Sequence, residues 1–474
     1  MATATRGHDP VSDALNEAPS GLLHLKAALT AGMGFVTDAY DLQIIGLALV
    51  LIKPQFNLSS TQVGLLSSTA LIASFIGAIV FGRISDLLGR KRIYGLEAAI
   101  MAVGAILTAF APNFGWLLVT RFILGIGIGG DYPTSAVLMT EWANKRNRGR
   151  QVGIMFAGYT GGQLLGLIVA MTLLASGIPH ELAWRLMLGL GALPALAVLN
   201  SRRRMPESPR YVSRVRGDTK KAAADLAAYS DGSVTATVTG PTPGGTMTVL
   251  RFLRTRGYLL ALLGTAGGWF FADISSYGNS LSAPLIIKGL APHAQLVTVP
   301  SITFMIAVLA ALPGLILTIY LIDRIGHKRI QLASLGLAGL MLILVGVIPG
   351  VTGSVGPFAV LYGAASFFGA GWGVTTMVFA AEVFPAAARG TGHGLSAGMA
   401  KFGAYMGALA APLLLAGIGL AHTELIAGIV YLGGAVCTLA LPEPSGRSLE
   451  DLGREDELAA QRGGTPEPVA SPTA

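Results

Sequence analysis

The apolar residues of this chain fall into long runs that are separated by short polar stretches. A helix needs about 20 apolar residues to cross the hydrocarbon core of a bilayer. Six runs of that length precede a polar stretch of about 55 residues, and six follow it, near 25–51, 60–82, 93–111, 115–137, 152–175, 183–200, 257–281, 297–322, 330–348, 356–380, 391–415 and 421–441. The pattern predicts an all-α membrane protein with twelve transmembrane helices in two groups of six.

The same pattern divides the chain into five parts. We expect a polar N-terminal segment over 1–21, a six-helix bundle over 22–201, a middle loop over 202–256, a second six-helix bundle over 257–441 and a tail over 442–474. The Thr-, Gly-, Pro- and Ser-rich residues Asp231–Gly245 are expected to be disordered. The polar tail is also expected to be disordered, apart from a short helix over Leu449–Gln461.

Composition supports a membrane protein and excludes several other classes. Only 12% of the 474 residues are charged, whereas soluble domains average about 25%. The single cysteine, Cys437, excludes an intramolecular disulfide. No nucleophile–base set or cluster of metal ligands is evident, so we expect no enzyme activity, cofactor or metal. A sensor or scaffold would need a long folded extension, and the middle loop and tail are short and poor in apolar residues.

Lys and Arg residues are concentrated in alternate loops. They are dense after the second, fourth, sixth and eighth runs and sparse in the loops between. Because cytoplasmic loops carry such an excess, both termini and the middle loop are predicted to be cytoplasmic, in a plasma (inner) membrane. The same bias explains the net charge of +8, so no nucleic-acid partner is expected.

The two groups of runs repeat each other. Asp86 begins DLLGRKR after the second run, and Asp323 begins DRIGHKR after the eighth. Glu141 precedes Arg148 by seven residues, as Glu382 precedes Arg389. Such repeats, with a binding site between the halves, are typical of alternating-access transporters.

Charged residues inside apolar runs are candidates for function, because a carboxylate at bilayer depth costs at least ~2.5 kcal/mol. The candidates are Asp38, Asp41, Asp131, Asp273 and Lys401. The glycine-rich run before Asp131 follows no strand, so we expect it to pack helices closely rather than to bind a nucleotide. The charged groups are predicted to share one central cavity.

The motifs resemble those of the major facilitator superfamily. GRISDLLGRKR at Gly82–Arg92 resembles its loop 2–3 signature, and PESPR at Pro206–Arg210 resembles another of its landmarks. A narrower resemblance, to the phosphate:proton symporter family, rests on TDAYD, GGDYPTSA, EWANKRNRGR, GWFFADISSYG and HGLSAGMAKFGA, which begin at Thr37, Gly129, Glu141, Gly268 and His393.

The resemblance implies a set of binding and proton-handling residues. The anion contacts that it implies are Tyr132, Gln163, Trp269, Asp273, Tyr277 and Lys401. It implies proton handling by Asp38 and Asp131, with Asp41 near them. The chain departs from the family at Gly373, where an Asn is usual. One expected donor to the anion is therefore missing, which leaves room for a larger substrate. A Gly-Pro pair typical of antiporters is absent from the fifth run, which favours symport.

Lys401 and Asp273 suggest how an anion and a proton are coupled. Lys401 is the only Lys or Arg inside the second-half runs, and its ammonium offers three donors. An ionised Asp273 beside a bound anion would repel it by roughly 4 kcal/mol at ~4 Å and an effective dielectric of about 20. Protonation removes the repulsion and adds a donor. Alternatively, Lys401 extends to the membrane interface, and Asp273 is a structural residue bonded near Ser275–Ser276.

Asp38 and Asp41 lie near one face of a helix, because they are three residues apart. With Asp131 they are expected to form an acidic cluster that holds and releases a proton. Arg121 resembles the superfamily's span-four arginine and is expected to adjust the proton affinity of Asp38. The alternatives are a helix-packing contact for Asp41 and a structural ion pair for Arg121.

A second set of charged residues lies at the cytoplasmic ends of the spans. We expect ion pairs that close an inner gate, although a purely topological role is the alternative. The residues are Asp86, Arg90, Glu141, Arg148, Glu382 and Arg389.

Together these observations predict a secondary active transporter. The leading hypothesis is proton-coupled symport of an inorganic anion, with phosphate favoured, by a monomer in the lipid bilayer. The alternative is proton-coupled symport of an organic anion, such as an aromatic or dicarboxylic acid, or of another small metabolite.

Overall fold

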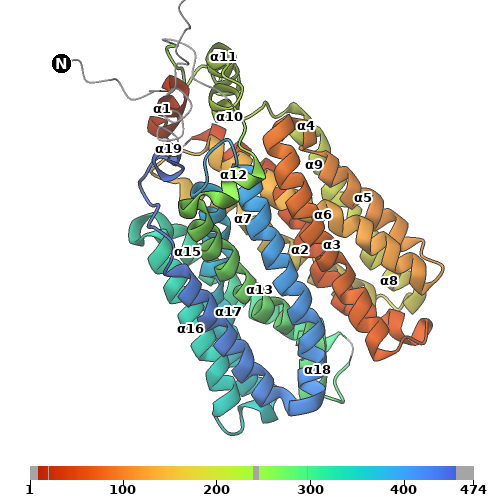
Figure 1. Ribbon diagram of the computed structural model, residues 1–474. Helices are drawn as coiled ribbons and strands as arrows, with labels where there is room; N and C mark the ends of the chain where they lie inside the picture. Colours follow the sequence, from red (N-terminus) through yellow and green to blue (C-terminus); the bar gives the residue numbers. More distant parts are fainter. Residues whose placement is uncertain (1–8, 20, 239–244, 296, 455–474) are drawn as a thin grey trace, which may run out of the picture.

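The computed structural model describes residues 9–19, 21–238, 245–295 and 297–454. Over these ranges the regular secondary structure is helical, with no strand. Two helical bundles stand side by side, the first coloured red to yellow and the second green to blue (Figure 1). The predicted all-α class is confirmed.

The first bundle contains six spans, two of which are interrupted. They are α2 (Leu22–Gln55), α3 (Ser60–Leu88), α4 with α5 (Arg90–Ile93 and Leu96–Ala109), α6 (Phe114–Trp142), α7 (Arg148–Ala175) and α8 with α9 (His180–Gly189 and Ala192–Arg204).

The second bundle begins with α13 (Arg256–Leu290). Its next span is α14 (Thr298–Ile306) and α15 (Leu312–Ile325), joined by the π-helical turn η1 (Ala307–Ala311). The helices α16 (His327–Val347), α17 (Val355–Glu382) and α18 (Arg389–Thr438) follow, with the short 3-10 turn η2 (Val351–Gly353) between α16 and α17.

The last helix, α18, contains two spans. It has 50 residues, and its backbone breaks at Gly419, which has φ 79° and ψ 173°. Eleven of the described helices are long and apolar enough to cross a membrane, and α18 is one of them. Because the break divides α18, the described helices supply the twelve spans that the apolar runs predict.

Close helix packing explains the glycine-rich run of α6. A Cβ atom at Gly125 would overlap the carbonyl oxygen of Ala70 in α3, and one at Gly129 would overlap that of Ser74. The two backbones can approach this closely only without side chains. The Ser74 hydroxyl donates a hydrogen bond to the Gly125 carbonyl at 2.9 Å, which fixes the contact.

The two bundles meet through equivalent helices. In the first bundle α2 packs against α7, and in the second α13 packs against α18. Between the bundles, α3 packs against α18, and α7 packs against α15. These are the second and fifth spans of one half against the fifth and second spans of the other, so the sequence repeat corresponds to a pseudo-symmetric interface.

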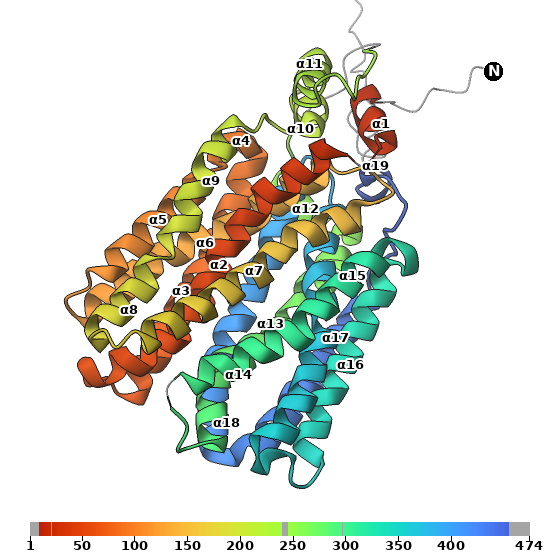
Figure 2. The same ribbon diagram turned by 180° about the vertical axis from the view of Figure 1, so that it is seen from behind.

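Five short helices lie together at one end of the molecule, at the top of Figure 1, and Figure 2 shows the same grouping from behind. They are α1 (Pro10–Glu17), α10 (Pro209–Arg214), α11 (Thr219–Tyr229), α12 (Val249–Arg254) and α19 (Leu449–Leu452). We call this end, with the loops that follow α3, α6 and α15, the basic end.

The middle loop and tail are more ordered than their composition predicts. Val234, inside the stretch expected to be disordered, is 7% exposed, and its N–H donates to the Ser230 hydroxyl at 3.1 Å. In the tail, α19 is helical, and the Tyr258 hydroxyl donates to the Gly453 carbonyl at 2.9 Å. Residues 239–244 and 455–474, which include the rest of both predicted stretches, lie outside the described residues.

Candidate functional site

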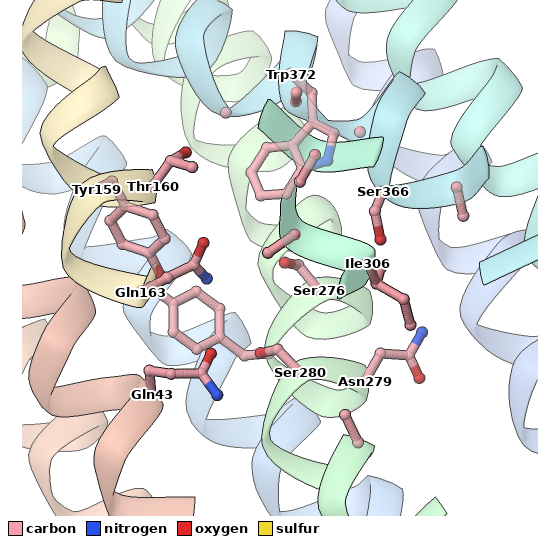
Figure 3. Close-up of a pocket in the computed structure, with 18 of the residues that line it drawn as sticks. Gln43, Tyr159, Thr160, Gln163, Ser276, Asn279, Ser280, Ile306, Ser366 and Trp372 are labelled. Carbon is pink, nitrogen blue, oxygen red and sulfur yellow. The ribbon is translucent and has the colours of Figure 1, made fainter. Parts of the chain in front are cut away.

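A cavity of ≈220 Å³ lies between the two bundles. Polar side chains from α2 and α7 face those from α13 and α17 across it (Figure 3). All six residues predicted to contact an anion line this cavity: Tyr132, Gln163, Trp269, Asp273, Tyr277 and Lys401. The lining also includes Ala283 and Ile287 of α13. Because α13 starts at the basic end, the cavity extends toward the opposite end of the molecule.

Lys401 lines this cavity and is 1% exposed. Its ammonium donates to the Tyr132 hydroxyl at 2.9 Å and to the Tyr277 hydroxyl at 2.6 Å. The Tyr277 hydroxyl lies 3.1 Å from that of Tyr159. The depth of the amine excludes the alternative in which Lys401 extends to the membrane interface. In the described residues its charge is held by neutral hydroxyl groups rather than by a carboxylate.

Asp38 and Asp273 present unpartnered carboxyl oxygens beside this lysine. Asp38 Oδ2 accepts a hydrogen bond from the Tyr132 hydroxyl at 2.6 Å. Asp38 Oδ1 and Asp273 Oδ2 are buried without a hydrogen-bond partner among the described residues. Both carboxyl groups interact electrostatically with Lys401. Buried polar atoms are rarely left unpaired, so these oxygens mark places where a proton or a ligand group can bind.

Asp41 pairs with Arg121. One carboxyl oxygen of Asp41 lies 2.5 Å from the Arg121 guanidinium, and both side chains are buried. The structure therefore supports the ion-pair alternative for Arg121 and places this arginine against Asp41 rather than against Asp38. Asp41 is still near enough to Asp38 to interact with it electrostatically.

Asp131 has a cationic partner that the sequence analysis placed in the middle loop. Helix α9 continues to Arg204, so Arg202 lies inside the first bundle and is 0% exposed. Its guanidinium lies 2.6 Å from Asp131 and 3.1 Å from Glu97, another buried acid that we did not single out. The three predicted acids of the first half are thus neighbours, but Asp131 and Asp41 each have an arginine and Asp38 does not.

Gly373 lines the cavity, as expected, but the space beside it is occupied. A Cβ atom there would lie 3.0 Å from Cε1 of the Phe156 ring. That ring stacks on Tyr159, with centroids 5.3 Å apart. The room gained by the absence of a side chain at this position is therefore filled by an aromatic ring from the first half.

Sequence reasoning missed several polar residues of the cavity, which are labelled in Figure 3. Gln43, Tyr159, Thr160, Ser276, Asn279, Ser280 and Ser366 all line it. Neutral side chains carry no burial penalty comparable to that of a charge, so nothing in the sequence distinguishes them from packing residues. The spacing of Ser276, Asn279 and Ser280 from Asp273 on one helix is the only available signal.

The six predicted gate residues form buried ion pairs at the basic end. Glu141 lies 3.0 Å from Arg90 and 3.0 Å from Arg389 of the other half. Arg148 lies 2.5 Å from Glu382, also across the halves. Asp86 lies 3.4 Å from Arg90. All six side chains are at most 1% exposed, so this end of the interface is closed.

Two aspartates reinforce this closure in equivalent ways. Asp86, at the end of α3, accepts backbone N–H bonds from Gly390 at 2.9 Å and Thr391 at 2.7 Å, at the start of α18. Asp323, at the end of α15, accepts from the N–H groups of Gly149 at 2.9 Å and Arg150 at 2.7 Å, at the start of α7. Carboxylates are stabilised at helix N-termini, so each half caps a helix of the other.

A further buried network joins the N-terminal segment, the middle loop and the tail. Arg210 donates to Asn16 at 2.8 Å and to Glu450 at 3.2 Å. Burial raises the pKa of Glu450, but the charges of Arg210 and Arg214 and the hydrogen bond from Asn16 outweigh it and hold that pKa at about 2. Glu450 is therefore ionised at neutral pH, and this network explains the order in the first part of the tail.

Sequence comparisons place this geometry among transporters. Residues 26–455 match the sugar (and other) transporter family. A probable inorganic phosphate transporter 1-6 of Arabidopsis thaliana is 33% identical, over 96% of this chain and 98% of the relative. A low affinity inorganic phosphate transporter 3 of Petunia hybrida is 34% identical, over 96% of each chain.

Solved structures share the fold. The proton:xylose symporter XylE, a protein of the major facilitator superfamily, superposes with a TM-score of 0.74 over 91% of this chain and 98% of its own, at 22% identity. An inward open conformation of XylE from E. coli gives a TM-score of 0.63 at 20% identity, over 91% of this chain and 99% of its own. At this identity the likeness supports the twelve-helix architecture only.

Proposed function

Because this chain belongs to the sugar (and other) transporter family of the major facilitator superfamily, we propose that it carries inorganic phosphate together with protons. The observation that carries the proposal is the buried Lys401, held by the hydroxyl groups of Tyr132 and Tyr277 beside two carboxyl groups with unpartnered oxygens. The names of the phosphate transporter relatives support the choice of anion.

The anion binds at the Lys401 ammonium. It takes hydrogen bonds from this cation and from the hydroxyl group of Tyr277, with Gln163 and Trp269 as further donors. The Tyr132 hydroxyl becomes a donor to the anion when a proton on Asp38 frees its O–H. Buried charges need a partner of opposite charge and satisfied hydrogen bonds, and a bound anion supplies that partner to Lys401. The missing donor at Gly373 is compatible with phosphate, because Phe156 closes the space there.

Protons bind to the carboxyl groups beside the anion. A protonated Asp273 removes the repulsion of an ionised carboxylate and donates through its oxygen. Proton and anion then favour each other's binding, and this reciprocity is the coupling that symport requires. Asp38 takes part through Tyr132, whose hydroxyl joins it to Lys401. Asp41 and Asp131 act on this proton site electrostatically, with charges balanced by Arg121 and Arg202.

Transport proceeds by alternating access. The paired charges at the basic end keep that side closed while the cavity is open toward the other. When anion and proton are bound, the ion pairs that Glu141 and Glu382 form with arginines of the other half separate, and the opposite side of the cavity closes. We assign the basic end to the cytoplasm of a plasma (inner) membrane, in accord with its lysines and arginines, and we propose that a monomer is the transporting unit.

A second candidate is proton-coupled symport of an organic anion. Aromatic rings favour it, because Phe156, Trp269, Trp372 and Phe358 line the cavity. Its volume of ≈220 Å³ is also many times the roughly 10–15 Å³ that a cavity needs to hold one water molecule. Competition of aromatic and dicarboxylic acids with labelled phosphate separates the two candidates.

The deciding experiment is uptake of labelled phosphate by proteoliposomes that hold the purified protein, with and without an inward proton gradient. We expect gradient-dependent uptake that is lost in Lys401→Ala. The matched control is Lys288→Ala, which removes an exposed ammonium that donates to the Ala294 carbonyl at 2.8 Å. Absence of phosphate uptake, in folded protein that moves protons with an organic acid, overturns phosphate as the substrate.

A further inference from the structure

A buried acid lies behind the cavity wall on the side away from the basic end. Glu424 follows the break of α18 at Gly419 and is 0% exposed. Its Oε2 accepts a hydrogen bond from Asn279 Nδ2 at 3.1 Å. Its Oε1 is buried without a hydrogen-bond partner among the described residues. The sequence analysis gave this residue no role.

No cation balances Glu424 within the described part of the chain. The helices that pack against α18 are chiefly α13, α3, α16, α6 and α17, and none of their described residues forms an ion pair with this acid. The titratable group that faces it is the phenol of Tyr362, which lines the cavity and in turn interacts with Tyr431. An ionised carboxylate buried with only an amide partner is destabilised by several kcal/mol. This cost favours protonation of the Glu424 carboxyl group.

Asn279 separates this acid from the cavity. It lies on α13, lines the cavity and points away from Gln43 in Figure 3. It follows Asp273 by six residues, about 9 Å along the helix at 1.5 Å per residue, in the direction away from the basic end. An amide has a donor end and an acceptor end. Whichever end binds Glu424, the other is available to the cavity.

We propose that Glu424 is a further proton-binding acid of the transport cycle and that its proton reverses the orientation of the Asn279 amide. When Glu424 is ionised, it accepts from the Asn279 amino group, and the amide carbonyl is left for the cavity. When Glu424 is protonated, its O–H donates to the amide carbonyl, and the amino group becomes a donor to an arriving anion. This inference rests on the proposed anion transport.

The proton comes from the solution that the open cavity reaches and returns to solution when the anion leaves. A carbonyl dipole repels an anion, whereas an amino group attracts it. The amide therefore makes anion binding at the outer part of the cavity stronger when the outside is acidic. Glu424 is a positioning residue in this scheme, because it acts on the anion through Asn279.

The test is the pH dependence of the KM for phosphate in proteoliposomes, between about pH 5 and pH 8. In Glu424→Gln the amide replaces the acid and can donate to the Asn279 carbonyl at every pH. We expect its KM at the alkaline end to be about threefold to tenfold below that of the wild type, the effect of one hydrogen bond, and to equal it at the acidic end. Asn279→Ala should keep a high KM with a flattened pH profile.

Two controls make the outcome decisive. Glu181→Gln alters an exposed acid in the first turn of α8 and should keep the wild-type profile. A wild-type KM profile in both Glu424→Gln and Asn279→Ala overturns the proposal. If Glu424→Gln does not fold, as judged by size-exclusion chromatography, the Asn279→Ala profile decides alone.

A measurement without substrate separates this inference from the proposed function. Infrared difference spectra of the purified protein between acidic and alkaline pH should contain a protonated-carboxyl band that Glu424→Gln lacks. If wild-type protein transports no phosphate but shows this band, the proposed substrate fails and the proton site stands. If the band is the same in both proteins, the proton site fails whatever the substrate.

Discussion

The cavity and the basic end both bury acidic residues between the two halves, but they compensate them differently. At the basic end Glu141 and Glu382 have arginine partners, and Asp86 also accepts backbone N–H bonds of the other half. In the cavity Asp38 is bonded to a phenol, and Asp273 has no ion pair among the described residues. The lysine between them is likewise held by phenols.

This difference indicates that the buried charges of the basic end and those of the cavity have different roles. A charge that is fully paired across an interface resists separation of its two sides, because breaking the pair leaves buried charges uncompensated. A charge that forms no ion pair can gain a proton or a ligand without first losing a partner. The basic end is thus suited to holding one conformation, and the cavity is suited to changing its charge.

The largest effect is expected from Asp273→Asn. This change keeps the size of the side chain and removes its proton site, so uptake driven by a proton gradient should be abolished. Exchange of internal for external phosphate needs no net proton movement and should persist. Parallel assays of gradient-driven uptake and of exchange check this, and near-normal gradient-driven uptake at neutral pH would contradict the proton role.

Next in size is Lys401→Met, which removes the cation from the cavity. Hydrogen bonds to charged groups contribute about 1.5–3 kcal/mol each, so the KM for phosphate should rise by roughly 10- to 100-fold. Initial rates over a range of phosphate concentrations measure it. A KM within twofold of the wild type, with Lys288→Met as the matched lysine variant, would remove Lys401 from the anion site.

At the basic end, Arg148→Met should open the interface. Removal of one partner from a buried ion pair costs about 3–5 kcal/mol, so amide hydrogen exchange at the starts of α7 and α18 should accelerate by about 100-fold or more. Uptake should fall only in part, because the cavity is intact. Arg185→Met is the control, since its partner Glu181 is 61% exposed; equal exchange in both variants would leave Arg148 with no role in closure.

A smaller effect is expected from Tyr159→Phe. It removes the hydroxyl that lies 3.1 Å from that of Tyr277 and leaves the ring stacked on Phe156. The loss of one hydrogen bond, about 0.5–1.5 kcal/mol, should raise the KM by roughly two- to tenfold. An unchanged KM would mean that Tyr277 needs no support to hold Lys401.

The smallest effect on uptake is expected from Glu450→Gln, less than about threefold. Because the pKa of Glu450 is lowered from 4.5 to about 2, the ionised acid stabilises the network at neutral pH. That stabilisation is lost as the pH falls from about 4.5 toward 2. Hydrogen exchange of α1 over this range should accelerate on acidification in the wild type, and it should be fast throughout in the variant. An equal acceleration of exchange on acidification in the wild type and in Glu450→Gln would exclude Glu450 as the cause of that acceleration.

The sequence predicted the fold well, because bilayer thickness constrains the length of every span. Apolar runs located all twelve spans, and the repeated motifs contain Asp86 and Asp323, whose capping of the opposite half only the structure shows. The boundary near Arg202 was misplaced, since a run of three arginines is usual in a loop and only the buried carboxylates of Glu97 and Asp131 draw the first of them inward.

Charges inside apolar runs and the family motifs predicted part of the candidate site, and its remaining neutral residues were not predictable. Asp273 and Lys401 line the cavity because a charge inside a span needs a polar environment, whereas the four neutral anion residues came from the resemblance alone. The arginine partners of Asp41 and Asp131 were not predictable, because they depend on how the helices are rotated about their axes. A single sequence does not determine that rotation. Glu424 was overlooked although it lies inside the predicted run 421–441, close to the start of that run.

The position of Arg202 determines how this protein can be divided into two co-expressed fragments. A fragment that ends at Asn200 would leave Glu97 and Asp131 buried in the first bundle without their cation, and it should be degraded before the second fragment binds. A cut between residues 239 and 244 keeps Arg202 and Arg210 with the first fragment. Glu450 of the second fragment then meets Arg210 only on assembly, so that contact can report when the two fragments have joined.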